Sequence, residues 1–301
     1  MAYRIVELTK PTECHVNNHQ LIVEQEDGTV QIPVEDIEII LCIGAKIRFS
    51  TMGLGELNQA GIVIVAFGKK HEPETIIEPY FPNQRHSAFL KMQINLSEDF
   101  KNCLWNKIIR QKIDNSSRNL AVLGCDGVKE IESYVSQVHD GDRDNIEAQA
   151  AAVYFQFYHK GLNRRNEDPV NSALNYGYAI VRSYIIKSII TTGFHCALGI
   201  NHHNEYNNFN LADDLIEPWR AMVDQLAYGI IGDDFNLSMK QRRELTGILH
   251  KPCKIDGKVM KISTGIELMV DSFKTAVVEN QPELIKLPIL LDFKTEVACE
   301  S

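Results

Sequence analysis

The chain has 301 residues, of which 44% are hydrophobic and 24% charged, which predicts two globular domains and excludes a largely disordered protein. No apolar run approaches the roughly 20 residues of a membrane span, and the amino terminus lacks a signal-peptide pattern, so we expect a cytoplasmic protein with no membrane partner. The net charge of −9 argues against nucleic-acid binding through bulk electrostatics, so any such contact would depend on local basic patches.

The first 75 residues have the pattern of a small β-rich domain. Alternating apolar residues predict strands over 3–8, 19–25, 29–34 and 37–43, and Asp27-Gly28 predicts a hairpin turn. Residues 51–60 have helical spacing, and another strand follows Gly61. This part contains no paired acids and no nucleophile beside a base, so we interpret residues 1–75 as a folding and dimerisation domain.

Prolines then mark a change in organisation. Pro73, Pro79 and Pro82 interrupt ladders and helices alike, which predicts a linker over residues 76–90. Ser97 can cap a helix that runs to about Leu123. Further helices are predicted over 128–139, 144–160, 168–191, 211–231, 238–250 and 263–280, with a hairpin at 254–262. The expected fold class is α+β, with a small β-rich domain joined by a linker to a larger, mainly α-helical domain over residues 91–301. Seven scattered cysteines form no CxxC pair and are expected to be reduced.

Side chains able to bind a metal gather between residues 198 and 220. His202 and His203 precede Asp213, Asp214 and Glu217, and helical spacing puts Glu217 on one face with either aspartate. An imidazole with carboxylates suits Mg²⁺ or Mn²⁺, and less well Zn²⁺. His202 and Glu217 form the first candidate ligand set. Spacing alone leaves a second interpretation open, in which these residues are a solvated helix face and a polar surface loop.

Glu147 is a candidate third ligand. It begins a helix rich in alanine and aromatic residues, where a carboxylate at the edge of the apolar surface is costly unless a cation meets it. A first-turn glutamate favoured by the helix dipole explains the same residue. Later in the chain, Pro218 predicts that the helix carrying Glu217 kinks or restarts.

Four ordered motifs resemble one family. They are EAQAA at 147–151 with Tyr154-Phe155, DPVNSALNYGY at 168–178, GINH at 199–202 and DLIEPWR at 214–220. Together they are similar to the integrase subunit of the CRISPR spacer-acquisition complex, and the wording FNLADDLIEPWR is closest to members from type II systems. The resemblance is strong from about 144 to 225, while the β-rich start, linker and helical domain agree more loosely with the family's architecture.

The resemblance implies a set of site residues. The family's metal ligands fall on Glu147, His202 and Glu217, which would hold Mg²⁺ or Mn²⁺, and Asp214 matches an additional acidic position. His202 stands three residues after Gly199, as in the family's pattern, although the neighbouring His203 leaves the choice of imidazole open. The motif that contains Gly177 is expected to support the core through close helix packing.

The same resemblance implies a metal-dependent DNA integrase. A free 3′-hydroxyl of a short incoming double-stranded DNA would attack a phosphodiester in the repeat of a CRISPR array, a transesterification without a covalent protein intermediate. A homodimer, a small companion subunit and other type II CRISPR proteins are the implied partners. A metal-dependent endonuclease acting on branched or damaged DNA and a non-catalytic helical scaffold remain the rival interpretations.

Contact with DNA would require basic residues near the metal. Arg242, Arg243 and Lys251 follow the metal-bearing helix in the sequence and are the candidates for phosphate contacts. A helix face with Lys107, Arg110 and Lys112 is a further basic patch.

Overall fold

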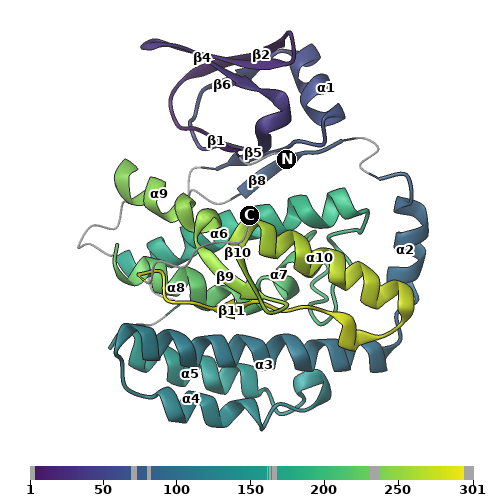
Figure 1. Cartoon of the computed structure of the whole chain (residues 1–301), viewed down its shortest axis with the longest axis vertical. Coiled ribbons are helices and arrows are strands. Elements are labelled where there is room, and N and C mark those ends of the chain that lie inside the picture. The colour runs from purple at the N-terminus through teal and green to yellow at the C-terminus, as the bar shows by residue number, and fades with distance from the viewer. Residues whose placement is uncertain are drawn as a thin grey trace. The chain divides into compact units, whose positions relative to one another are not determined.

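The computed structural model describes residues 4–68, 73–79, 83–160, 162, 164, 168–230 and 237–294. The chain forms two compact units, residues 1–86 and 87–301 (Figure 1). Within the described ranges no helix is both long enough and apolar enough to span a bilayer.

The first unit is built mainly from strands, as its alternating sequence predicts. Its elements are β1 (Arg4–Leu8), β2 (Thr12–Asn17), β3 (Gln20–Gln25), β4 (Gly28–Pro33), β5 (Ile37–Cys42), β6 (Ile47–Phe49), α1 (Thr51–Gln59), β7 (Val63–Phe67) and β8 (Pro73–Ile77), with a 3₁₀ turn, η1 (Val34–Asp36), before β5. One sheet has the order β1-β5-β7-β8 with only β8 antiparallel, and the other has the order β4-β3-β2-β6. Apolar side chains from both sheets and α1, including Leu21, Ile40 and Leu57, form one core.

Two hairpin turns explain why one feature of this unit was predicted and one strand, β2, was missed. The predicted hairpin is present, with Gln25 opposite Gly28. A second hairpin joins β2 to β3, because Asn18 and His19 both adopt positive φ angles, as a two-residue turn requires. The sequence prediction missed β2, since Asn-His is a weaker turn signal than Asp-Gly. The predicted linker at 76–90 contains the end of β8 and the start of α2 (His86–Ile94).

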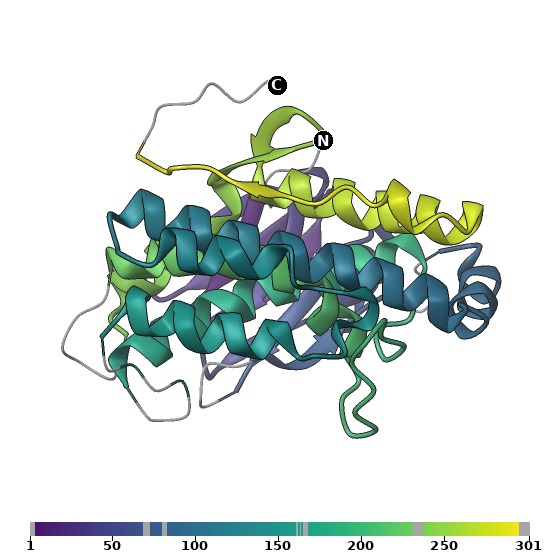
Figure 2. The ribbon, with the colours of Figure 1, turned by 90° about the horizontal axis from the view of Figure 1, so that it is seen from below.

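The second unit is mainly helical, which confirms the expected α+β class. Its helices are α2, α3 (Glu98–Leu123), α4 (Val128–Val135), α5 (Ile146–Tyr158), α6 (Pro169–Thr192), α7 (Asn210–Leu215), α8 (Arg220–Tyr228), α9 (Met239–Thr246) and α10 (Ile262–Glu279). Short 3₁₀ segments are η2 (Asp140–Asp142), η3 (Glu217–Trp219), η4 (Gly247–His250) and η5 (Pro282–Leu284). The long helix α3 packs against α4, α5, η3 and α8, and Figures 1 and 2 both show it beside α4 and α5.

Two predicted helix features are confirmed in detail. Ser97 caps α3, its hydroxyl accepting from the Phe100 backbone N–H at 3.2 Å. The helix predicted over 211–231 is divided into α7, η3 and α8, because Pro218 cannot donate a backbone hydrogen bond. The carbonyl of Pro218 instead accepts from Asn115 Nδ2 on α3 at 2.7 Å, which fixes η3 against that helix.

Close packing and a small sheet complete this unit. A Cβ atom on Gly177 would lie 2.4 Å from Val223 Cγ1, so glycine allows α6 to approach α8, as predicted. The strands β9 (Pro252–Ile255), β10 (Lys258–Lys261) and β11 (Ile289–Leu290) form an antiparallel sheet in the order β10-β9-β11. The predicted Asp256-Gly257 turn joins β9 to β10. The described cysteines are free thiols, and Cys299 lies outside the described residues.

Candidate functional site

Two of the predicted ligands meet at one lysine. Glu147 is in the first turn of α5, and its backbone N–H donates to Asp142 Oδ2 at 3.0 Å, which fixes the start of that helix. Its Oε1 accepts a short hydrogen bond from Lys112 Nζ on α3. Glu217 Oε2 lies 2.5 Å from the same nitrogen, in an ion-pair contact without regular hydrogen-bond geometry. Both carboxylates therefore converge on one position, and a cationic group lies there.

Glu217 is held in its charged form by two basic neighbours. The residue is only 4% exposed, and its Oε1 accepts from Arg220 Nε at 2.9 Å. Burial alone would raise the pKa of Glu217, but the charges of Arg220 and Lys112 outweigh it and lower the pKa to about 2. Burial likewise opposes the charge on Lys112, yet Glu217 and Glu147 raise the pKa of that ammonium above its usual value. Glu217 and Lys112 are thus both charged at neutral pH.

His202 is oriented by the neighbouring acid Asp214. The ring Nδ1 of His202 lies 2.6 Å from Asp214 Oδ1. Because a carboxylate only accepts hydrogen bonds, Nδ1 carries the proton and Nε2 remains as the nitrogen that can bind a metal. This hydrogen bond is the main cause of the raised pKa of His202, opposed by burial and assisted by the charges of Asp214 and Glu217.

The same carboxylate also shapes the loop that carries His202. Asp214 is fully buried and accepts from the backbone N–H groups of Ile200, Asn201 and His202, at 2.5, 3.1 and 3.1 Å. A Cβ atom at Gly199 would lie 2.3 Å from the His202 carbonyl oxygen and 2.8 Å from Asp214 Oδ2. Glycine is therefore required where the loop closes on the carboxylate.

Two neighbouring residues of the motif have other surroundings. Asp213 forms an ion pair with Arg182, with Nε to Oδ1 at 2.5 Å. His203 is exposed and lines a pocket of about 390 Å³ together with Lys101 and several asparagines. The predicted preference for His202 over His203 stays a prediction, and the contact of His202 with Asp214 supports it.

The donors present suit a divalent cation only in part. Within the described ranges, no three His, Cys, Asp or Glu side chains lie close enough together to hold a metal ion. The two carboxylates of Glu147 and Glu217 do fit, since their oxygens already share one cationic partner. His202 supplies the right chemistry, an imidazole with its Nδ1 occupied by a carboxylate. These oxygen and nitrogen donors are typical of Mg²⁺ or Mn²⁺ sites.

A buried polar network that the sequence analysis missed lies behind this centre. Asp224 on α8 is 2% exposed and accepts hydrogen bonds from Tyr154 OH, at 2.8 Å, and from Tyr178 OH. Burial raises the pKa of Asp224 to about 6, although both hydroxyls oppose the shift. A small cavity of about 50 Å³ is lined by these three residues together with Lys112, Glu147 and Arg220.

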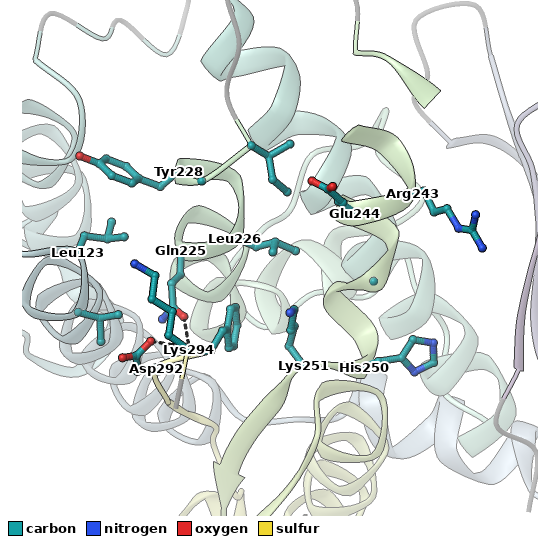
Figure 3. Close-up of a pocket in the computed structure, with 15 residues that line it drawn as sticks. Leu123, Gln225, Leu226, Tyr228, Arg243, Glu244, His250, Lys251, Asp292 and Lys294 are labelled. Carbon is teal, nitrogen blue, oxygen red and sulfur yellow. Dashed lines mark hydrogen bonds between the residues drawn. The ribbon is translucent and has the colours of Figure 1, made fainter. Parts of the chain in front are cut away.

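Two of the three predicted DNA-contacting residues line a different pocket. Arg243 and Lys251 line a cavity of about 630 Å³ that none of the predicted ligands lines. Figure 3 shows the Lys251 side chain facing Leu226, whereas the Arg243 side chain extends away from Leu226. Arg242 donates from Nε to the Leu237 carbonyl at 2.9 Å. The role of these residues in DNA binding stays a prediction.

The basic groups beside the carboxylates are instead Lys112 and Arg220. The sequence carried a signal for Lys112, which belongs to the basic face with Lys107 and Arg110 on α3. The sequence carried no signal for the contact between Lys112 and Glu217, because these two residues are 105 positions apart in the chain.

Comparison with known proteins gives the family. Residues 6–250 match the family model described as CRISPR associated protein Cas1. The chain is 32% identical to "CRISPR-associated endonuclease Cas1" of Neisseria meningitidis serogroup C (strain 8013), over 98% of both chains. It is 28% identical to "CRISPR-associated endonuclease Cas1 2" of Pyrobaculum aerophilum, over 79% of this chain and 87% of that relative.

Solved structures agree on the fold. A "Casposase bound to integration product" matches with a TM-score of 0.76 at 18% identity, over 99% of this chain and 96% of that one. A Cas1 protein from Thermotoga maritima matches with a TM-score of 0.72 at 15% identity, over 91% and 97% of the two chains. The resemblance that the four motifs predicted is confirmed, and the chain belongs to the Cas1 family of CRISPR-associated proteins.

Proposed function

We propose that this chain is a metal-dependent DNA integrase that inserts short double-stranded DNA into a CRISPR repeat array. The observation that carries the proposal is the convergence of Glu147 and Glu217 on a single cationic position. Both carboxylates are supplied by helix starts fixed by other residues, Asp142 for α5 and Asn115 for η3. Such preorganised oxygens are what a site for Mg²⁺ or Mn²⁺ requires.

In the proposed reaction, the 3′-hydroxyl of the incoming DNA attacks a phosphodiester of the repeat. The new P–O bond forms as the bond to the repeat strand's own 3′-oxygen breaks, and the hydroxyl proton leaves to solvent. A bound divalent ion would lower the pKa of the attacking hydroxyl and neutralise charge on the phosphate. Glu147, Glu217 and the Nε2 atom of His202 would hold that ion. Asp214 holds the ring proton on Nδ1 and so leaves Nε2 as the ligand nitrogen, and Arg220 keeps Glu217 charged and in place.

Assembly belongs to the same proposal. Each chain supplies one such centre, whereas insertion of a DNA segment requires two strand transfers, so a homodimer that works with a small companion subunit is the expected form. The fold neighbours include a structure titled "Cas6-RT-Cas1--Cas2 complex", with a TM-score of 0.76, 20% identity, and coverage of 94% of this chain and 36% of that chain. Light scattering of the full chain should give twice the monomer mass of 34.1 kDa.

A metal-dependent endonuclease is the second candidate, since relatives carry that name. It would use the same ligands with water as the nucleophile. Joining of DNA ends separates the two functions, because an endonuclease cuts the target but leaves the labelled donor unjoined. A non-catalytic scaffold would join and cut nothing.

Alanine substitutions test the proposal. Purified protein, with its companion subunit, is mixed with Mn²⁺, a donor DNA labelled at its 5′ end and a repeat-containing target. Glu147→Ala, His202→Ala and Glu217→Ala should each abolish joining, and His203→Ala should retain most of it. Wild-type joining by any of the three ligand variants would remove that residue from the proposed site.

A further inference from the structure

Lys112 occupies an unusual position for a lysine. It lies in the middle of α3 with only 13% of its side chain exposed, and its Nζ contacts Glu147 Oε1 and Glu217 Oε2 together. Since both oxygens touch one nitrogen, they can be no further apart than the sum of the two contacts. Two carboxylates at that separation repel each other unless a cation lies between them.

A divalent ion bound to both oxygens would need the position that Lys112 Nζ holds. The ammonium and the ion are therefore competitors, because like charges cannot share one pair of carboxylates at contact distance. Arg220 differs, since it contacts Glu217 through the other oxygen, Oε1, and can stay where it is. Lys112 has a flexible four-carbon stem that can move its charge, whereas Arg220 is also held over the Tyr178 ring, with 4.8 Å from Cζ to the centroid.

We propose that Lys112 is an exchangeable cation of this site, which holds Glu147 and Glu217 together, gives up their oxygens to a divalent ion, and then binds a DNA phosphate. This inference rests on the proposed metal site for the exchange and on the proposed reaction with DNA for its last step. The cavity of about 50 Å³ beside Lys112 and Arg220 provides room for the side chain to leave the carboxylates. A displaced ammonium next to a metal-bound phosphate would add a second positive group on that phosphate.

The first experiment measures metal affinity. Lys112→Met keeps most of the side-chain length and removes the charge, and Mn²⁺ binding is followed by calorimetry. We expect affinity to rise on the order of tenfold, because the ion no longer displaces a competitor. A merely structural lysine predicts the opposite sign, since its loss would separate the two carboxylates. Lys107→Met removes the same charge from the same helix, without a described contact to either acid, and should change Mn²⁺ affinity little.

A second measurement uses the wild-type protein, so that it stands even if Lys112→Met does not fold. Reductive methylation of lysines is mapped by mass spectrometry with and without saturating Mg²⁺. The methylation rate of Lys112 should rise several-fold with Mg²⁺, because the amine leaves its two carboxylates. The rate at Lys107 should not change. An unchanged rate at Lys112 would overturn the exchange.

The third measurement concerns the phosphate. Lys112→Met should weaken binding of duplex DNA in Mg²⁺ buffer and reduce the slope of log affinity against log salt by about 0.9. In EDTA the variant and the wild type should have equal slopes. Equal slopes in both buffers would overturn the phosphate contact and leave the metal competition standing.

These outcomes separate the inference from the proposed function. If the wild type joins DNA but Lys112→Met loses Mn²⁺ affinity, the exchange is wrong and the integrase proposal stands. If Lys112→Met gains Mn²⁺ affinity and the wild type joins no DNA, the exchange stands and the integrase proposal fails.

Discussion

Replacing Asp214 by asparagine should weaken metal binding by changing the tautomer of His202, which Asp214 orients. In the wild type, Oδ2 accepts from the N–H groups of Ile200 and Asn201, and Oδ1 accepts from the N–H and Nδ1–H of His202. Asparagine offers one oxygen, which accepts hydrogen bonds, and one NH₂ group, which only donates them. Two of these four N–H groups must therefore face the NH₂ group, another donor.

The two orientations of the asparagine differ in cost. If the NH₂ group faces Ile200 and Asn201, two backbone N–H groups lose their acceptor, and the buried one at Ile200 costs about 1–3 kcal/mol. If it faces His202, one backbone N–H loses its acceptor, and the ring can accept from the NH₂ group by moving its own proton to Nε2. The second orientation is favoured by roughly the cost of one unsatisfied N–H, about 1–3 kcal/mol. It leaves His202 with a protonated Nε2, which cannot bind a metal.

We therefore expect Asp214→Asn to lower Mn²⁺ affinity by about 10–100-fold, the usual effect of removing the partner of a metal-binding histidine. Stability should fall by about 1–3 kcal/mol, measured by urea unfolding. Asp213→Asn is the matched control, because it removes the charge of the adjacent residue and leaves the hydrogen bond between Asp214 and His202 in place. It should change Mn²⁺ affinity little. Wild-type affinity in Asp214→Asn, or an equal loss in the control, would refute the orienting role.

Three further predictions follow from individual contacts. Gly199→Ala should destabilise the His202 loop and weaken Mn²⁺ binding, as its Cβ would lie 2.3 Å from the His202 carbonyl oxygen; calorimetry that gives wild-type affinity would contradict this. For Asp224, burial raises the pKa from 3.8 to about 6, so the folded protein holds this proton longer than the unfolded chain, and the contribution to stability falls as pH rises from about 4 to about 6. The shift of about two pKa units corresponds to roughly 3 kcal/mol, so Asp224→Asn should gain up to that much relative to wild type between these pH values in urea unfolding, and a pH-independent difference would contradict the assignment. Arg243→Ala with Lys251→Ala should flatten the salt dependence of DNA affinity by roughly two units if both contact phosphate, and an unchanged slope would exclude both residues from the DNA contacts.

Sequence patterns predicted most elements of the fold because their signals are local. Ser97 caps the helix that it precedes, Pro218 interrupts the helix that contains it, and Asp256-Gly257 forms the turn between two adjacent strands. Each effect is local, so the nearby sequence was enough to predict it. The strand β8 was missed because Pro73 was interpreted as an interruption, whereas it is the first residue of that strand, a position that proline tolerates.

The candidate site was predictable only in part. Spacing indicated His202 and Glu217, the edge of an apolar helix indicated Glu147, and the family resemblance joined the three in one ligand set, whose role stays a prediction. The contacts that hold these residues are made across long stretches of chain. Lys112 meets Glu217 across 105 positions, so no local spacing could pair them. The expectation that Arg243 and Lys251 flank the ligands used nearness in sequence. Both line a pocket that none of the predicted ligands lines, and their contact with DNA stays a prediction.

The most direct test of an integrase is the fate of the DNA end. Donor duplexes with a normal 3′-hydroxyl and with a 3′-deoxy end are incubated with the wild-type protein, its companion subunit, Mn²⁺ and a repeat-containing target. We predict that the hydroxyl donor is joined to the target, and that the deoxy donor gives neither joined product nor target cleavage. Equal cleavage of the target with both donors would show that water is the nucleophile, and would contradict the integrase proposal.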